Sequence, residues 1–279
     1  MTRRSKLRTG ILTLLLQLVW PALAASIGVA PHAVFMSDRE RTAEVTLFNS
    51  TSAAEEVELA FQYGFPVADS TGKMVIALYA DPDPDDPSAA GWLRAFPRRV
   101  RVEPGQRQII RVQASPPDDL PPGEFWSRMI ITSRPASPRG VPLDSGFSAT
   151  VNIQLRTIIS VNYRNGDVST DVSLDSLWVE AVPDTLRAWV GLDRGGNAAY
   201  LGSAVLTLES ADGSVVLRSG PYQVAVYRPL RRWFALPVEG LAPGDYTLRV
   251  AISTEREDLA LEDVIPAPAV EGSAQVTIP

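Results

Sequence analysis

The sequence contains no cysteine and only one histidine among its 279 residues. The lack of cysteine excludes disulfides, thiolate nucleophiles, zinc ribbons and iron–sulfur clusters. A single histidine leaves no histidine-rich metal site and little chemistry for a triad that uses histidine as its base. Most enzyme mechanisms therefore lack the side chains that they need. We expect a protein that is not an enzyme and that holds no metal ion and no cofactor.

Long apolar runs are also lacking, except near the N-terminus. Four basic side chains within residues 3–8 precede the apolar stretch Ile11–Trp20, and small residues follow at Ala24–Ala25. This order is typical of a secretory signal peptide, and the apolar stretch is short for a membrane span. We predict a signal peptide over residues 1–25 and a mature chain in the periplasm without stable membrane insertion. An uncleaved membrane anchor is the alternative.

Basic charge is scarce once that segment is removed. The remaining chain has 22 Lys and Arg against 32 Asp and Glu, a formal net charge of −10. Nucleic-acid binding depends on basic patches, so we expect no nucleic-acid partner. The apolar fraction of 45% is that of a globular protein, and the length suggests about two domains.

Sustained helical periodicity is lacking as well. Short runs instead alternate between apolar and polar residues, as at Val45 and Leu47 or at Ile110 and Val112, and turn residues such as Glu103–Gln106 separate them. This pattern is typical of a β-sandwich or barrel. In the second half we expect strands at Leu186–Leu192, Ala204–Leu208, Tyr222–Tyr227, Trp233–Leu236, Tyr246–Ile252 and Ala274–Ile278. A turn at Asn165–Asp167 divides the chain, which predicts two β-sandwich domains at residues 26–164 and 165–279.

Several stretches, taken in order, resemble one known family. They are Trp92–Val112, Pro117–Ile130, Thr150–Arg164, Leu192–Asn197 with Tyr200–Gly202, and Val224–Tyr227 before Arg231–Arg232. On these residues the chain resembles a divergent branch of the PapD-like periplasmic chaperones of pilus assembly, over nearly the whole mature chain. The resemblance implies an all-β protein with two Ig-like β-sandwich domains joined at an angle.

The resemblance also implies a function. Members of this family bind pilus or fimbrial subunits by donor-strand complementation and deliver them to an outer-membrane usher, and the free protein could self-associate. A subunit that lacks its last strand docks against the long final strand of the first domain, here Thr150–Arg164. Val151, Ile153 and Leu155 alternate with polar residues and so share one face of that strand. The alternation alone also fits a second interpretation, in which these residues fill the chain's own core.

The family's carboxylate anchor is altered in this sequence. Many members hold the subunit's C-terminal carboxylate with an arginine on the first strand and a lysine on the last, where His32 and Ser160 stand here. These side chains can donate hydrogen bonds but bind a carboxylate less strongly than an Arg–Lys pair. Arg156 and Arg164 are nearby cations that could replace the pair, whereas His32 could equally be an ordinary polar residue between the domains. Glu124 and Arg164 match family positions that pair across the domain junction.

The acidic run Asp81–Asp86 suggests calcium binding at first. An EF-hand loop counted from its first residue would require glycine and glutamate where Asp86 and Trp92 stand. A solvated loop stiffened by proline is therefore the better interpretation.

Two other functions remain open. A secreted β-sandwich binding module would recognise carbohydrate or a surface protein through its loops, and the missing basic pair favours this alternative. A hydrolase would have to build its nucleophile and base from His32 or from carboxylates alone.

Overall fold

The computed structural model describes residues 27–137, 139–142, 148–151 and 153–279. The predicted signal peptide at residues 1–25 lies outside these residues. The described chain is built of β-strands, together with one short 3₁₀ helix, η1 (Leu261–Asp263). No helix within the described ranges is long and apolar enough to cross a membrane.

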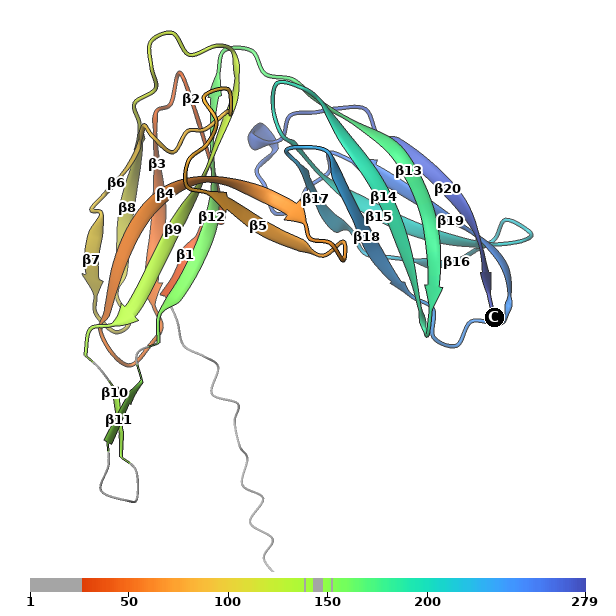
Figure 1. Cartoon of the computed structure of the whole chain (residues 1–279), viewed down its shortest axis with the longest axis horizontal. Coiled ribbons are helices and arrows are strands. Elements are labelled where there is room, and N and C mark those ends of the chain that lie inside the picture. Colours follow the sequence, from red (N-terminus) through yellow and green to blue (C-terminus); the bar gives the residue numbers. More distant parts are fainter. Residues whose placement is uncertain (1–26, 138, 143–147, 152) are drawn as a thin grey trace, which may run out of the picture.

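Two sheets form the first body of the molecule (Figure 1). One has the strand order β1-β3-β8-β6, and the other has the order β2-β12-β9-β4-β5, with β7 also paired to β4. Their bounds are β1 (Ile27–Ala30), β2 (Ala33–Ser37), β3 (Thr42–Asn49), β4 (Glu55–Ala68), β5 (Met74–Tyr79), β6 (Leu93–Phe96), β7 (Arg99–Val102), β8 (Arg107–Ala114), β9 (Gly123–Pro135) and β12 (Leu155–Asn165). A separate hairpin pairs β10 (Arg139–Pro142) with β11 (Ser148–Val151).

Two further sheets form the second body. Their strand orders are β13-β14-β18 and β16-β15-β19-β20, with β17 also paired to β15. The bounds are β13 (Thr170–Val182), β14 (Thr185–Gly196), β15 (Tyr200–Ser210), β16 (Val215–Arg218), β17 (Tyr222–Val226), β18 (Leu230–Pro237), β19 (Gly244–Ser253) and β20 (Val270–Ile278). The two bodies meet at an angle (Figure 1), so the prediction of an all-β fold with two sandwich-like bodies is confirmed. The domain limits stay a prediction.

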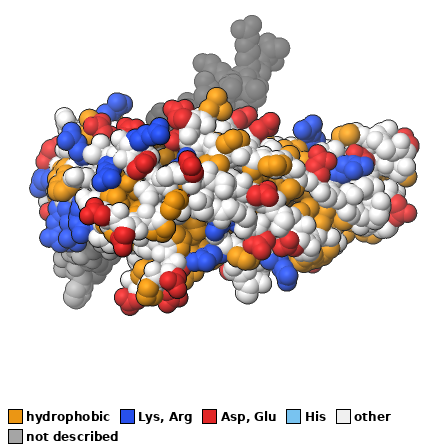
Figure 2. Space-filling view, turned by 90° about the horizontal axis from the view of Figure 1, so that it is seen from above, with side chains coloured by type: hydrophobic (Ala, Val, Ile, Leu, Met, Phe, Trp, Pro, Cys, Tyr) orange, Lys and Arg blue, Asp and Glu red, His pale blue; other side chains and the backbone are white. Residues whose placement is uncertain are grey.

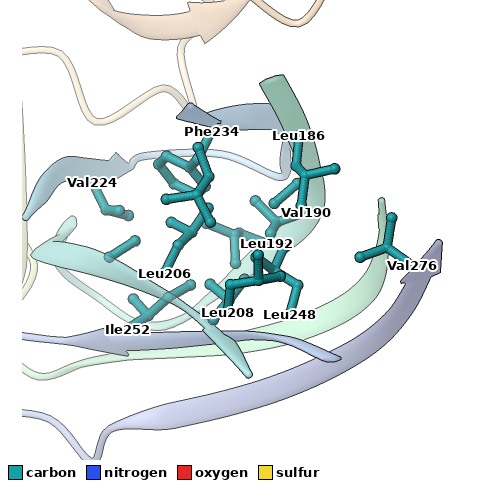
Figure 3. Close-up of a cluster of buried hydrophobic side chains, with 14 of the residues drawn as sticks. Leu186, Val190, Leu192, Leu206, Leu208, Val224, Phe234, Leu248, Ile252 and Val276 are labelled. Atoms are coloured by element: carbon teal, nitrogen blue, oxygen red, sulfur yellow. The ribbon is translucent and has the colours of Figure 1, made fainter. Parts of the chain in front are cut away.

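Each body has its own hydrophobic core between its two sheets. In the first body the alternation read from the sequence places Val45, Leu47, Ile110 and Val112 inside. In the second body, side chains from both sheets point toward one another and exclude water (Figure 3). Because alternate residues of a strand face opposite sides, the same pattern that defines the strands also decides which side chains are buried.

Acidic and basic side chains are interspersed on the face shown in Figure 2, with apolar side chains between them. Elsewhere in the described structure, charged side chains form exposed ion pairs, such as Glu58 with Arg99 and Glu56 with Arg134. Exposed pairs of this kind contribute little to stability, because water solvates both partners.

The structure departs from the sequence-based expectation in several strands. The segments that form β5 and β13 were not predicted as strands; β5 is an unbroken apolar run without alternation. The expectation of one continuous strand over Thr150–Arg164 is wrong, since β11 ends at Val151 and β12 begins at Leu155. Leu155 pairs with Ser133, and β9 ends two residues later, so β12 has no further partner on that side.

Two neighbouring isoleucines of β8 test this burial pattern. Ile110 is fully buried, whereas Ile109 is 53% exposed. We expect Ile110→Ala to lower the free energy of unfolding by about 2–5 kcal/mol, since it removes buried methyl groups and leaves a cavity. Ile109→Ala should change it by less than about 1 kcal/mol. Urea denaturation followed by circular dichroism measures both, and equal losses would contradict the assigned faces of β8.

Candidate functional site

One face of β12 carries an apolar stripe that is longer than the core it serves. Ile159, Val161 and Tyr163 on this face are buried in the first body. Leu155 lies on the same face, separated from Ile159 by the half-buried Thr157, yet 43% of its surface is exposed, and Ile153 just before the strand is 60% exposed. The opposing sheet therefore covers only the C-terminal part of the stripe.

The edge of β12 is also free along this exposed part. β9 pairs with the whole of β12, whereas β2 pairs in parallel only with Ser160–Arg164. Among the described residues, no strand pairs with Leu155–Ile159 on the side opposite β9. Unpaired backbone groups beside exposed apolar side chains are the two features that the addition of a foreign strand requires.

The structure places the three predicted donor residues on different segments. Val151 ends β11 opposite Arg139, and its side chain lies outside the described part. Ile153 lies between the strands, and Leu155 begins β12. The described side chains of Ile153 and Leu155 do not belong to the core of this chain, but the three residues do not form one continuous strand.

The proposed anchor positions meet at the junction where the two bodies pack together. The Ser160 N–H donates to the carbonyl of His32 at 3.1 Å, and the Ser160 hydroxyl lies 3.4 Å from the hydroxyl of Tyr227 in the second body. The His32 side chain is exposed. Arg156 is exposed four residues before Ser160, which places it about 13 Å away along the strand. The structure thus brings His32 and Ser160 together and leaves Arg156 apart.

A cation that the sequence interpretation missed lies at this junction. Arg128 of β9 is directly opposite Ser160 and is only 4% exposed. Its Nε donates to the carbonyl of Gly64 at 3.0 Å, and its guanidinium carbon lies 5.1 Å from the ring centre of Tyr227. Its buried Nη2 has no hydrogen-bond partner among the described residues, and Arg128 forms no ion pair with any of them.

A second unsatisfied donor belongs to the same cluster. The Nδ2 of buried Asn162 also lacks a described partner, while its Oδ1 accepts from the Ser160 hydroxyl at 3.2 Å. A buried cation without a counter-charge and a buried amide N–H without an acceptor are costly, and an anion that receives hydrogen bonds from Arg128 Nη2 and Asn162 Nδ2 offsets the cost. We call Arg128, Ser160, Asn162 and Tyr227 the cleft cluster; its chemistry suits a carboxylate. The available sequence signal was an arginine inside the apolar run Phe125–Ile131.

Aromatic side chains from both bodies form one wall of the cleft. The Tyr227 ring lies edge-on to Trp126 at 4.8 Å and stacks on Phe65 at 6.0 Å. Burial raises the pKa of neighbouring Tyr63 to about 12, and its hydroxyl donates to Asp86 at 3.2 Å. Asp86 also pairs with Arg228 of the second body at 2.5 Å. This end of the acidic run therefore joins the two bodies, where a solvated loop was expected.

A buried ion pair joins the bodies on the other side of Trp126. Glu124 pairs with Arg164 at 2.9 Å, and its second oxygen accepts from the Trp126 indole at 3.0 Å and from the Ala199 N–H at 3.2 Å. Arg164 also donates to the carbonyl of Asp263 at 2.6 Å. The pair thus connects β9 and β12 with two segments of the second body.

These features define an all-β protein of two sandwich bodies, with an unpaired arginine in the shared cleft and a free strand edge beside exposed apolar residues. No protein-family model and no curated protein matches the sequence.

Among solved structures, the chain is similar to PapD-like pilus chaperones. A chain of the CsuC–CsuE chaperone–tip adhesion subunit pre-assembly complex of Acinetobacter baumannii matches with a TM-score of 0.44 and 12% identity, over 88% of this chain and 98% of that chain. The CupB2 chaperone of Pseudomonas aeruginosa matches with a TM-score of 0.40 and 14% identity, over 88% and 98%. A chain of the SafA pilin–SafB chaperone complex of Salmonella enterica matches with a TM-score of 0.39 and 13% identity, over 91% and 97%.

The buried junction pair allows a direct stability test. Glu124→Gln removes the counter-charge of Arg164, which is largely buried. We therefore expect the free energy of unfolding to fall by about 3 kcal/mol or more. Glu56→Gln breaks an exposed pair with Arg134 and should cost less than about 1 kcal/mol. Chemical denaturation of both variants measures the difference, and a Glu124→Gln variant as stable as Glu56→Gln would show that the junction pair contributes little.

Proposed function

We propose that this protein is a periplasmic chaperone that binds pilus or fimbrial subunits through β12, protects them and delivers them to an outer-membrane usher for assembly. The observation that carries the proposal is the exposure of Ile153 and Leu155 beside the unpaired edge of β12. A strand that served only its own core would bury these side chains. Together with the sequence resemblance, this favours donation of the strand to a partner.

The geometry suggests how donation works. The backbone of Leu155–Ile159 offers hydrogen bonds to a strand of the subunit, which adds to the free edge. The apolar side chains of Ile153 and Leu155 then enter the open core of the subunit, where burial removes them from water. The donated strand thereby covers the exposed core of the subunit, through which the subunit would otherwise aggregate. No chemical step is needed.

The cleft cluster supplies the second contact in this proposal. A subunit strand that ends at Ser160 would place its terminal carboxylate near the unsatisfied donors of Arg128 and Asn162. From there the strand would run along the free edge toward Leu155, roughly 16 Å away. Arg128 therefore takes the anchoring role in place of the predicted Arg156, with the Asn162 amide as the second donor.

Strand donation is preferred to the two other functions. A binding module would recognise its ligand through loops, whereas the exposed apolar residues and the free edge lie at the start of a strand. A hydrolase would need a base near a nucleophile, and His32 contacts Ser160 only through its backbone carbonyl.

Donation is tested by placing a charge on the exposed stripe. We expect co-expression with the fimbrial subunits encoded near its gene to yield soluble one-to-one complexes. Ile153→Asp should abolish them, because an unpaired carboxylate buried in the subunit costs several kcal/mol. The melting temperature of the free protein should not change, since Ile153 is exposed. Gln154→Asp, the exposed neighbour in sequence, is the control and should keep the complex.

Strand donation would be contradicted by a different result. In that result, Ile153→Asp unfolds the isolated protein, and the fraction that remains folded still binds subunits normally. Subunits that stayed soluble and intact without this protein would remove the need for a chaperone.

The anchor is tested with peptides of the subunit's C-terminal strand, made as the free acid and as the amide. Wild-type protein should bind the free acid about 10- to 100-fold more tightly than the amide, because a charge-assisted hydrogen bond contributes about this much to affinity. Arg128→Gln should lose this preference, Arg128→Lys should restore part of it, and Arg156→Gln should keep it. A preference that survived in Arg128→Gln and vanished in Arg156→Gln would return the anchor to the exposed arginine.

A further inference from the structure

The β4–β5 hairpin extends from the first body to the second. Its turn, Asp69–Lys73, lies against the β13-β14-β18 sheet (Figure 1). The Trp233 indole donates to the carbonyl of Thr71 at 2.8 Å. Ala68 and Met74, on either side of the turn, pack against the hydrophobic core of the second body. The hairpin therefore belongs to the first body by sequence and to both bodies by contact.

The turn contacts two members, Trp189 and Trp233, of a row of three tryptophans. Trp178, Trp189 and Trp233 lie directly opposite one another in the register of β13, β14 and β18. Trp178 stacks on Trp189 at 5.5 Å, and Arg187 lies 5.2 Å from the ring centre of Trp233. We call these three residues the tryptophan row.

Gly72 is the point of closest approach between the turn and the tryptophan row. It is buried and has a φ of +78°, a conformation that favours glycine. A Cβ atom at this position would lie 2.5 Å from the ring of Trp189 and 2.7 Å from the ring of Trp233. No side chain fits there unless the turn moves away from the second body.

A contact far from the linker has a mechanical consequence. The chain passes from one body to the other once, between β12 and β13, and a single connection of this kind leaves the bodies free to rotate. The contacts at Asp86 and Glu124 hold the bodies together at the junction, and the turn adds an attachment at a distance from them (Figure 1). An attachment far from the junction restrains the angle between the bodies, and this angle places Tyr227 over Arg128.

We propose that the turn Asp69–Lys73 is a latch: by docking on the tryptophan row it fixes the angle between the bodies and thereby positions Tyr227 in the cleft cluster. Gly72 and Trp233 are thus positioning residues, which act on the cleft without lining it. The expected effect on subunit binding rests on the function proposed above, whereas the effect on the angle does not.

The second body contains a matched control for this turn. In the turn Asp69–Lys73, the Asp69 N–H donates to the carbonyl of Lys73 at 2.9 Å. The Gly72 N–H donates to the carbonyl of Asp69, also at 2.9 Å. Ser210–Ser214 makes the same two bonds at 2.9 Å, with Gly213 at the equivalent place. Gly213 has a φ of +84° and no atom within 4 Å of a Cβ built on it. A side chain at Gly213 therefore meets the same backbone strain without any docking contact.

The experiment measures the distance between the bodies directly. The absence of native cysteine allows spin labels at Gln106→Cys and Glu239→Cys, two exposed positions in different bodies. We expect a narrow distance distribution in the labelled parent. Gly72→Val should broaden and shift it, and Gly213→Val should not. Trp233→Phe, which removes only the indole donor and part of the ring, should give a smaller broadening and serves if Gly72→Val does not fold.

Subunit binding is measured on the same proteins. If the latch holds the competent angle, loss of about nine-tenths of that population in Gly72→Val would weaken binding about tenfold. A folded Gly72→Val or Trp233→Phe variant with the parent's distance distribution would overturn the latch. If the distribution broadens but the wild-type protein binds no subunit, the latch stands and the proposed function fails.

Discussion

Strand β12 is hydrogen-bonded on both edges over only part of its length, and most of the functional geometry depends on this constraint. Where β2 and β9 flank it, its inward residues complete the core of the first body. Nearer its N-terminal end, the described part of the opposing sheet does not cover this face, so Leu155 and the preceding Ile153 are exposed. One periodic stripe thus serves the core of this chain at one end and is available to a partner at the other.

The cleft between the bodies contains two kinds of buried charge. Glu124 and Arg164 neutralise each other, and every oxygen of the carboxylate has a partner, so this pair serves the junction. Arg128 has a backbone acceptor and the face of Tyr227 but no anion. A fold that only had to be stable would gain little from such a residue, because burial of an unpaired cation is costly. Costs of this kind are typical of sites that bind a ligand.

The angle between the bodies connects these two features. The cleft cluster takes Tyr227 from the second body and its other members from β9 and β12. Contacts at Asp86, at Glu124 and at the tip of the β4–β5 hairpin join the bodies at three separate places. A partner that needed both the free edge of β12 and the cleft cluster would therefore meet a preformed surface, which lowers the ordering cost of binding.

The sequence by itself determined the β-rich class, the two sandwich bodies and the buried faces of strands such as β3 and β8, because alternation depends only on near neighbours in the chain. It identified Ile153 and Leu155 as apolar residues of one face, but not whether water or core surrounds them, since that depends on how far the opposing sheet extends. It also missed β5, whose apolar run lacks alternation. Only the tertiary structure brought Arg128 opposite Ser160 and under Tyr227, and Gly72 against Trp189 and Trp233. These contacts join residues far apart in the chain, through strand register and the packing of one body on the other, and no local pattern records them.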